Sequence, residues 1–284
     1  MKIGIGLPIT TAGTNGELLL TWAKRAEDAA FDSLTAIDRI VYPGFESLTA
    51  LAAAGAVTSR IGLRTNVLLA PTRSAVMVAK QAASVDQISG GRFMLGIGVG
   101  RRQDDYEAVG REFSRRGRQL DDDLETICSE WRGEPAGSRA NPSSLPTVEA
   151  AGVPMVFGGS LEAATPRVLR HGVGWSVSVR GPAEVGEMVT TLRSSWHAAG
   201  REGEPYVIVM NYFALGADAS VDYLLDYYGY QGQRSHSIAA GAHRSAANVK
   251  ETVEAFAAIG VDEYTFVPTM ADIGQVDLLA DAIS

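Results

Sequence analysis

The stretch IGLRTNVLLAPTRSAVMVAKQAASVDQISGGRFMLGI, residues 61–97, contains the pattern that decides the fold. Residues 61–69 are apolar and rich in β-branched side chains, which predicts a strand. Residues 74–88 are predicted to form a helix, and Gly90-Gly91 is a typical stop after a helix. A second strand is predicted at 93–97. A strand, a helix and a second strand in this order predict a parallel β-α-β unit.

The same alternation continues along the whole chain. Strands are predicted at 3–7, 34–37, 61–69, 93–97, 153–157, 173–179, 206–215 and 263–267. Helices are predicted at 17–31, 47–58, 74–88, 117–131, 165–171, 183–199, 221–228, 246–259 and 273–283, with long loops at 133–151 and 229–243. Alternating strands and helices imply a parallel sheet covered by helices.

Eight such units favour a closed (β/α)8 barrel, an α/β fold, with a single domain over residues 1–284. The alternative is a doubly wound sheet. That fold needs a glycine-rich fingerprint after its first strand, and Leu7-Pro8-Ile9-Thr10 contains none.

Composition and charge exclude several functional classes. Lys and Arg number 25 and Asp and Glu 33, so the net charge is −8, which disfavours binding to nucleic acid or to an anionic membrane. The single cysteine, Cys128, excludes an intramolecular disulfide and a thiolate metal cluster, and its helical apolar neighbours predict a buried, inert thiol. The first residues do not resemble a signal peptide, and no apolar run is long enough to span a bilayer. We expect a cytoplasmic protein.

Residues at the strand ends are candidates for chemistry, because barrels place their sites there. Gly158, Gly159 and Ser160 follow a predicted strand and precede a predicted helix, where a phosphate can bind close to the backbone and to free N–H groups. An ordinary strand–helix turn is the alternative. Thr165 is expected to cap the helix and Pro166 to be its first residue.

Two further segments end strands. Gly96-Ile97-Gly98-Val99-Gly100 lacks the GxGxxG spacing of a dinucleotide site but suits a backbone packed against a flat ligand; a flexible turn is equally compatible. Asp38-Arg39 can orient a substrate or carry a proton, or can form an ion pair at the rim.

The chain shows no metal-ligand spacing and no catalytic triad. His171 and His197 fall at predicted helix ends, and His236 and His243 on a predicted loop. With no metal site and no resident nucleophile, a bound cofactor is the natural source of difficult chemistry.

Several segments resemble the bacterial luciferase-like family of flavin- or deazaflavin-dependent oxidoreductases. They are LRTNVLLAP at 63–71, KQAASVDQISGGRF at 80–93, LGIGVG at 95–100, Gly158-Gly159-Ser160 and GVGW at 172–175. The resemblance covers most of the chain and is strongest over 1–132 and 153–180. It implies a (β/α)8 barrel, a homodimer, and FMN or the deazaflavin coenzyme F420 as cofactor.

The resemblance also implies roles for residues at matching positions. Gly158, Gly159 and Ser160 would hold the cofactor phosphate. Asn66 and Val67 would lie against the isoalloxazine ring, where the family often has a cis peptide bond that does not involve proline. Gly98 and Val99 would line the other approach to the ring.

One position departs from the family pattern. An acidic residue followed by His is common after the second strand, whereas this chain has Asp38-Arg39, our candidate catalytic pair. Arg39 is no ordinary base, because a guanidinium stays protonated. Instead it can stabilise negative charge on a reduced flavin or bind an anionic substrate. Tyr42, Arg102 and Tyr212 are the candidates for the substrate wall.

We therefore predict a flavin-dependent oxidoreductase acting on a small organic molecule. FMN, the cofactor placed first, favours monooxygenation, with a separate flavin reductase as a partner. Coenzyme F420 favours hydride transfer, and the arginine-rich composition points towards it. A non-catalytic flavin-binding protein is the second alternative, which the missing histidine supports.

Overall fold

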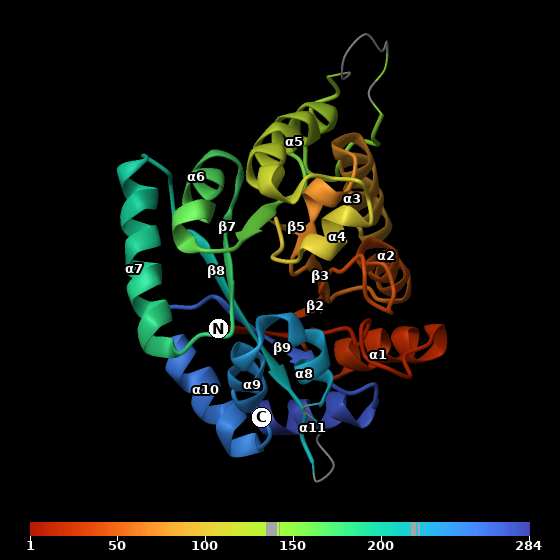
Figure 1. The fold of residues 1–284 in the computed structure, drawn as a ribbon, viewed down its shortest axis with the longest axis vertical. Coiled ribbons are helices and arrows are strands. Elements are labelled where there is room, and N and C mark those ends of the chain that lie inside the picture. Colours follow the sequence, from red (N-terminus) through yellow and green to blue (C-terminus); the bar gives the residue numbers. More distant parts are fainter. Residues whose placement is uncertain (135–140, 142, 217–219, 221) are drawn as a thin grey trace.

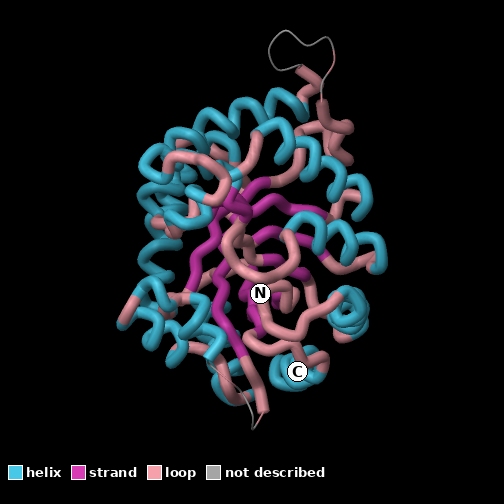
Figure 2. Tube along the Cα trace, turned by 45° about the vertical axis from the view of Figure 1, so that its right-hand side comes forward, coloured by secondary structure: helices cyan, strands magenta, loops and turns pink. Residues whose placement is uncertain are grey.

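A computed structural model describes residues 1–134, 141, 143–216, 220 and 222–284. Its strands form one sheet that closes into a barrel, and helices surround it (Figures 1 and 2). The strands are β1 (Lys2–Gly6), β2 (Ser33–Ala36), β3 (Gly62–Thr65), β4 (Leu68–Leu69), β5 (Phe93–Gly98), β6 (Met155–Gly158), β7 (Gly174–Ser178), β8 (Tyr206–Phe213) and β9 (Glu263–Pro268). All neighbouring strands pair in parallel, and pairing of β3 with β5 closes the sheet. The predicted single-domain (β/α)8 barrel is confirmed.

The helices follow the strands as predicted in most places. They are α1 (Gly16–Asp28), α2 (Ser47–Val57), α3 (Ala75–Ser89), α4 (Gln103–Glu107), α5 (Arg116–Trp131), α6 (Leu161–His171), α7 (Pro182–Ala198), α8 (Asp222–Tyr227), α9 (Gln233–Ala240), α10 (Ala246–Ala258) and α11 (Gly274–Ile283). Local signals set their ends. Asn15 accepts a hydrogen bond from the Leu18 amide at the start of α1, and Gly90, with φ of 65°, ends α3.

The strand predicted at 61–69 is interrupted. It forms β3 and β4, and the Asn66–Val67 peptide bond between them is cis. Both pieces pair with β5, so together they occupy one position in the barrel, which therefore has eight. The cis bond lies where the family resemblance implied one.

A polar network fills the barrel interior near the N-terminal ends of the strands. Arg64 of β3 donates two hydrogen bonds to Glu263 of β9, at 3.0 and 2.7 Å. Ser33 and Tyr206 also donate to Glu263. A Cβ on Gly4 would lie 2.7 Å from Glu263 Oε1, so glycine is required there for the network to fit.

Two sequence predictions need correction, and a third concerns a segment that lies partly outside the described residues. Residues 229–243 are not a plain loop, because Ile238 and Ala239 are buried against α8 and 233–240 form the helix α9. Helix α6 begins at Leu161 with Ser160 as its N-cap, so Pro166 lies inside the helix and Thr165 is not the cap. The loop predicted at 133–151 lies partly outside the described residues.

Candidate functional site

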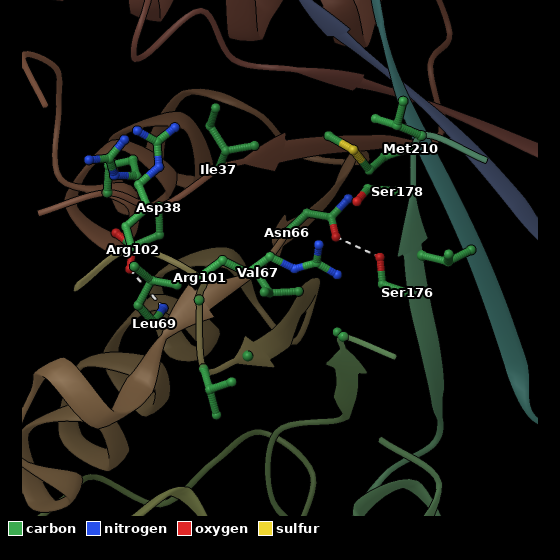
Figure 3. Close-up of a pocket in the computed structure, with 18 of the residues that line it drawn as sticks. Ile37, Asp38, Asn66, Val67, Leu69, Arg101, Arg102, Ser176, Ser178 and Met210 are labelled. Atoms are coloured by element: carbon green, nitrogen blue, oxygen red, sulfur yellow. Dashed lines mark hydrogen bonds between the residues drawn. The ribbon is translucent and has the colours of Figure 1, made fainter. Parts of the chain in front are cut away.

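A cavity of about 440 Å³ opens at the C-terminal ends of the strands. This is the end where barrels place their sites, and the volume suits a small-molecule site, for which roughly 300–1,000 Å³ is usual. Figure 3 shows part of its wall, with Asn66 and Val67 between two groups of side chains. On one side the labelled residues include Asp38, Leu69 and Arg102, and on the other Ser176, Ser178 and Met210.

The start of α6 forms a corner of this cavity whose groups suit an anion. Gly159 has φ of +120°, a conformation that residues with a Cβ rarely adopt, and a Cβ there would meet nothing within 4 Å. Ser160 is exposed and its hydroxyl makes no capping hydrogen bond. The first N–H groups of a helix have no partner within the helix. The Ser160 hydroxyl, the first backbone amides of α6 and the positive end of the helix dipole together suit a phosphate group.

Two arginines that sequence reasoning missed also line the cavity. Arg167 of α6 pairs with Asp121, at 2.6 Å, and donates to the Gly117 carbonyl. Arg116, the first residue of α5, donates through Nη1 to the Phe113 carbonyl, while its buried Nε has no partner among the described residues. The arginine-rich run at 111–118 was a signal for Arg116, but it gave no indication that α5 starts beside the cavity.

Val67 fills the base of the cavity with an apolar side chain. A Cβ on Gly98 would lie 2.5 Å from Val67 Cγ2, and one on Gly158 would lie 2.9 Å from Val67 Cγ1. Glycine is therefore required at both positions so that Val67 can reach between β5 and β6. The half-buried Val67 presents a surface on which a flat ring can pack, and the backbone of Val99 continues the wall.

Asn66 adds a polar group beside Val67. Its Oδ1 accepts a hydrogen bond from Ser176 Oγ at 2.7 Å, which fixes the orientation of the amide (Figure 3). Its Nδ2 is buried and has no hydrogen-bond partner among the described residues. An unpaired buried donor costs about 1–3 kcal/mol, which an accepting ligand atom would recover. The ring carbonyls and nitrogens of a flavin are acceptors of this kind.

Asp38 and Arg39 line the cavity but do not pair with each other. Asp38 accepts hydrogen bonds from the Leu69 amide and from Arg73, at 2.8 and 2.7 Å, and also from Ser47. Burial acts to lower the pKa of Arg73, but Asp38 and Glu46 outweigh it and raise that pKa above its usual value. Asp38 therefore holds the segment after β4 in place.

Arg39 forms its ion pair with a different acidic residue, Asp105. Its Nε donates to Asp105 at 2.9 Å, with both side chains almost fully buried. Asp105 also accepts from the backbone amides of Ile40 and Val41. This pair ties the segment after β2 to α4. Neither Asp38 nor Arg39 is positioned as a free acid or base, and their catalytic role stays a prediction.

The predicted substrate-wall residues Tyr212 and Arg102 both line the cavity. Tyr212 OH lies 2.7 Å from Tyr228 OH, and burial raises the pKa of both hydroxyls, so they stay protonated. The Arg102 guanidinium stacks over Tyr227 and Tyr230, at 4.6 and 4.2 Å from their ring centres, and donates to the Tyr227 carbonyl. These contacts connect the end of β5 to the segment after β8 across the cavity mouth.

Tyr42 is placed elsewhere. It lines a second cavity of about 530 Å³ beside Thr10 and Phe45. Its hydroxyl donates to Asp226 at 2.7 Å, and burial together with this carboxylate raises its pKa to about 12. The Tyr227 ring, 5.0 Å away between centres, lies between Tyr42 and the first cavity.

The remaining candidates take structural positions. Cys128 is half-buried with Sγ 3.8 Å from His171 Nδ1, and burial raises its pKa, so the thiol is poorly reactive. His243 is buried between Tyr264 and Asn248, and burial lowers its pKa. Within the described residues, no group of three His, Cys, Asp or Glu is arranged to hold a metal ion, and no helix has the length and apolar character needed to cross a membrane.

Comparisons with known proteins identify relatives in sequence and in fold. The uncharacterised protein Rv0940c of Mycobacterium tuberculosis is 28% identical over 233 residues, 72% of this chain and 81% of its own length. The monooxygenase RslO1 of Streptomyces bottropensis superposes with a TM-score of 0.80 at 19% identity, covering 100% of this chain and 98% of its own. An F420-dependent secondary alcohol dehydrogenase gives 0.80 at 16% identity, covering 100% of both. At these identities the structures show a shared fold.

A sequence profile of the luciferase-like monooxygenases matches residues 1–280. The match spans every strand of the barrel and all the residues that line the cavity. Of the two solved structures, one is a monooxygenase and the other an F420-dependent dehydrogenase. The chain belongs to the luciferase-like monooxygenase family.

Proposed function

We propose that this protein is an oxidoreductase that holds a flavin-type ring against Val67, with the cofactor phosphate at the start of α6. The observation that carries this proposal is that one cavity combines three features. They are the uncapped start of α6 after Gly159 and Ser160, the apolar base formed by Val67, and the unpaired side-chain nitrogen of Asn66. When bound, such a ring supplies the exchange of a hydride or of electrons.

The protein's own residues bind, orient and exclude water. Asn66 donates to an acceptor on the ring edge, because Ser176 fixes its Oδ1 and leaves Nδ2 free. The Tyr212–Tyr228 hydroxyl pair keeps a proton at the substrate wall and donates a hydrogen bond to a substrate oxygen. Arg39 and Asp38 keep two loops in place, since each is held in an ion pair.

Of the two cofactors, the charge around the cavity favours the deazaflavin. Among the described residues, the cavity is lined by more positive than negative side chains. The positive ones are Arg39, Arg101, Arg102, Arg116, Arg167, Arg180 and Arg234, and the negative ones are Asp38 and Asp105. FMN carries one phosphate, whereas F420 carries a phosphate and an oligoglutamate tail. We therefore place hydride transfer with F420 ahead of the FMN prediction made from the sequence. FMN-dependent monooxygenation is the second candidate, supported by the RslO1 superposition.

Titration of the purified protein with FMN and with F420, followed by cofactor fluorescence, tests the proposal. We expect saturable binding of at least one ring, and faster reduction or oxidation of that ring when substrates are added. Binding without any turnover over a broad panel of alcohols, aldehydes and imines would instead support the non-catalytic flavin-binding alternative. Absence of binding by both rings would reject the proposal.

A further inference from the structure

The arginines of the cavity exceed what one phosphate group needs. Arg39 is neutralised by Asp105, and Asp38 by Arg73. Arg167 pairs with Asp121 and Arg180 with Glu184, and neither of these acidic residues lines the cavity. The four others have no ion pair with any residue in the described ranges: Arg101, Arg102, Arg116 and Arg234. This surplus exists in a chain whose net charge is −8.

The four unpaired arginines divide into two groups by their place in the fold. Arg116 lies at the start of α5, next to Gly117, whose carbonyl accepts from Arg167 of α6. It therefore belongs with the phosphate corner. Arg101 and Arg102 follow β5, and Arg234 lies in α9 on the segment that also supplies Tyr227 and Tyr230.

Arg102 is oriented before any ligand binds. Its guanidinium is stacked over Tyr227 and Tyr230, and one nitrogen donates to the Tyr227 carbonyl. A stacked guanidinium loses little freedom on binding and keeps its remaining N–H groups available as a fork that matches a carboxylate. Arg101 precedes Arg102 in the chain, is exposed and lines the same cavity.

We infer that Arg101, Arg102 and Arg234 form a second anion site, which takes carboxylates, across the cavity mouth from the phosphate corner. The inference rests on the proposed function, because it assumes that the start of α6 is occupied by the cofactor phosphate. FMN has no group for this second site. Two sources supply the carboxylate: the oligoglutamate tail of F420, or an acidic substrate.

Binding affinities of three ligands test the second site. FMN, F420 without glutamates and F420 with several glutamates are titrated into the full-length protein at low and high NaCl, with fluorescence as the readout. We expect the glutamate-bearing form to bind about tenfold more tightly than the form without glutamates, equivalent to one strong charge-assisted contact. The difference should shrink in high salt, which screens exposed charges.

The variant Arg101→Gln/Arg234→Gln removes two exposed charges of the site and should bring the two F420 forms to nearly equal affinity. Arg244→Gln, an exposed arginine that does not line the cavity, is the matched control and should keep the ratio. Thermal melts show that each variant is folded. A second arm titrates succinate into protein saturated with F420 lacking glutamates, to detect a carboxylate that belongs to a substrate.

The outcomes separate the two sources and the two proposals. If F420 with glutamates binds more tightly than F420 without them, and the double variant abolishes this difference, the site belongs to the cofactor tail. If the two F420 forms bind equally, and succinate binds to the wild type but not to the double variant, the site belongs to an acidic substrate. A ratio near one with no succinate binding overturns the second site while leaving ring binding intact. If neither FMN nor either F420 form binds, the proposed function fails and this inference fails with it.

Discussion

Two buried arginine–carboxylate pairs lie at opposite ends of the same barrel and differ in what surrounds them. Arg64–Glu263, at 2.7 Å near the N-terminal ends of the strands, is enclosed by Ser33, Tyr206 and Thr265. Arg39–Asp105, at 2.9 Å near the C-terminal ends, borders a cavity with further arginines. The first pair completes the core, whereas the second stabilises loops that carry unneutralised charge. The same chemistry thus serves packing at one end and the anchoring of cavity loops at the other.

Glu263→Gln should give the largest effect, because it leaves the Arg64 charge buried without a counter-charge. We expect the free energy of unfolding to fall by about 3–5 kcal/mol, measured by chemical denaturation. Tyr206→Phe removes only one hydrogen bond to Glu263 and is the matched control, with an expected loss of about 1 kcal/mol. A loss below about 1 kcal/mol for Glu263→Gln would show that the network contributes little to stability.

Acid should weaken the same end of the barrel. Burial alone would raise the pKa of Glu263, but Arg64 and the hydrogen bonds from Ser33 and Tyr206 lower it to about 2. Because the folded pKa lies below the unfolded value, this contribution is fully present above about pH 4.5 and is lost as pH falls towards 2. We expect about 3 kcal/mol of stability to be lost over that range. Denaturation as a function of pH should show a steeper decline for the wild type than for Glu263→Gln.

Asp105→Asn tests the pair at the other end. It removes the counter-charge of buried Arg39 and weakens the contacts that hold the Ile40 and Val41 amides, so we expect a loss of about 2 kcal/mol. Asp104→Asn is the control, because Asp104 is half-exposed and its contact with Arg39 is 3.4 Å long. Equal melting temperatures for the two variants would contradict a structural role for the Arg39–Asp105 pair.

Gly159→Asp should affect ligand binding more than stability. Both Gly159→Asp and Gly159→Ala bear the cost of the positive φ, so their difference isolates the charge introduced beside the phosphate. We expect Asp to bind the cofactor at least about tenfold more weakly than Ala, which corresponds to about 1.4 kcal/mol. Titration of both variants measures the ratio. Equal affinities would place the phosphate away from α6.

The barrel could be predicted from the chain because each strand and helix carries a local signal. Apolar runs such as 153–157 and the stop at Gly90-Gly91 need no knowledge of distant residues. Contacts between distant segments could not be predicted. Asp38 binds Arg73 and Arg39 binds Asp105, and nothing in the adjacency of Asp38 and Arg39 indicates that each has a separate partner.

The candidate site shows the same difference between local signals, which can be read from the sequence, and contacts between distant segments, which cannot. Gly158, Gly159 and Ser160 could be proposed as an anion site because a strand, glycines and a helix follow one another in sequence. Helix α9 was missed because its polar residues hide the burial of Ile238 and Ala239 against α8. Arg116 and Arg234 approach the cavity from different parts of the chain, so only the folded structure brings them together.

The arginine-lined mouth has a consequence for how quickly ligands arrive. The net charge of this chain is −8, so an anion is repelled on average, whereas the arginines at the mouth attract it. Such a distribution directs diffusing anions towards one opening and raises their association rate, an effect that ionic strength reduces. If the cavity binds anions as proposed, the placement of a few unpaired arginines would select ligands by their rate of capture as well as by their affinity.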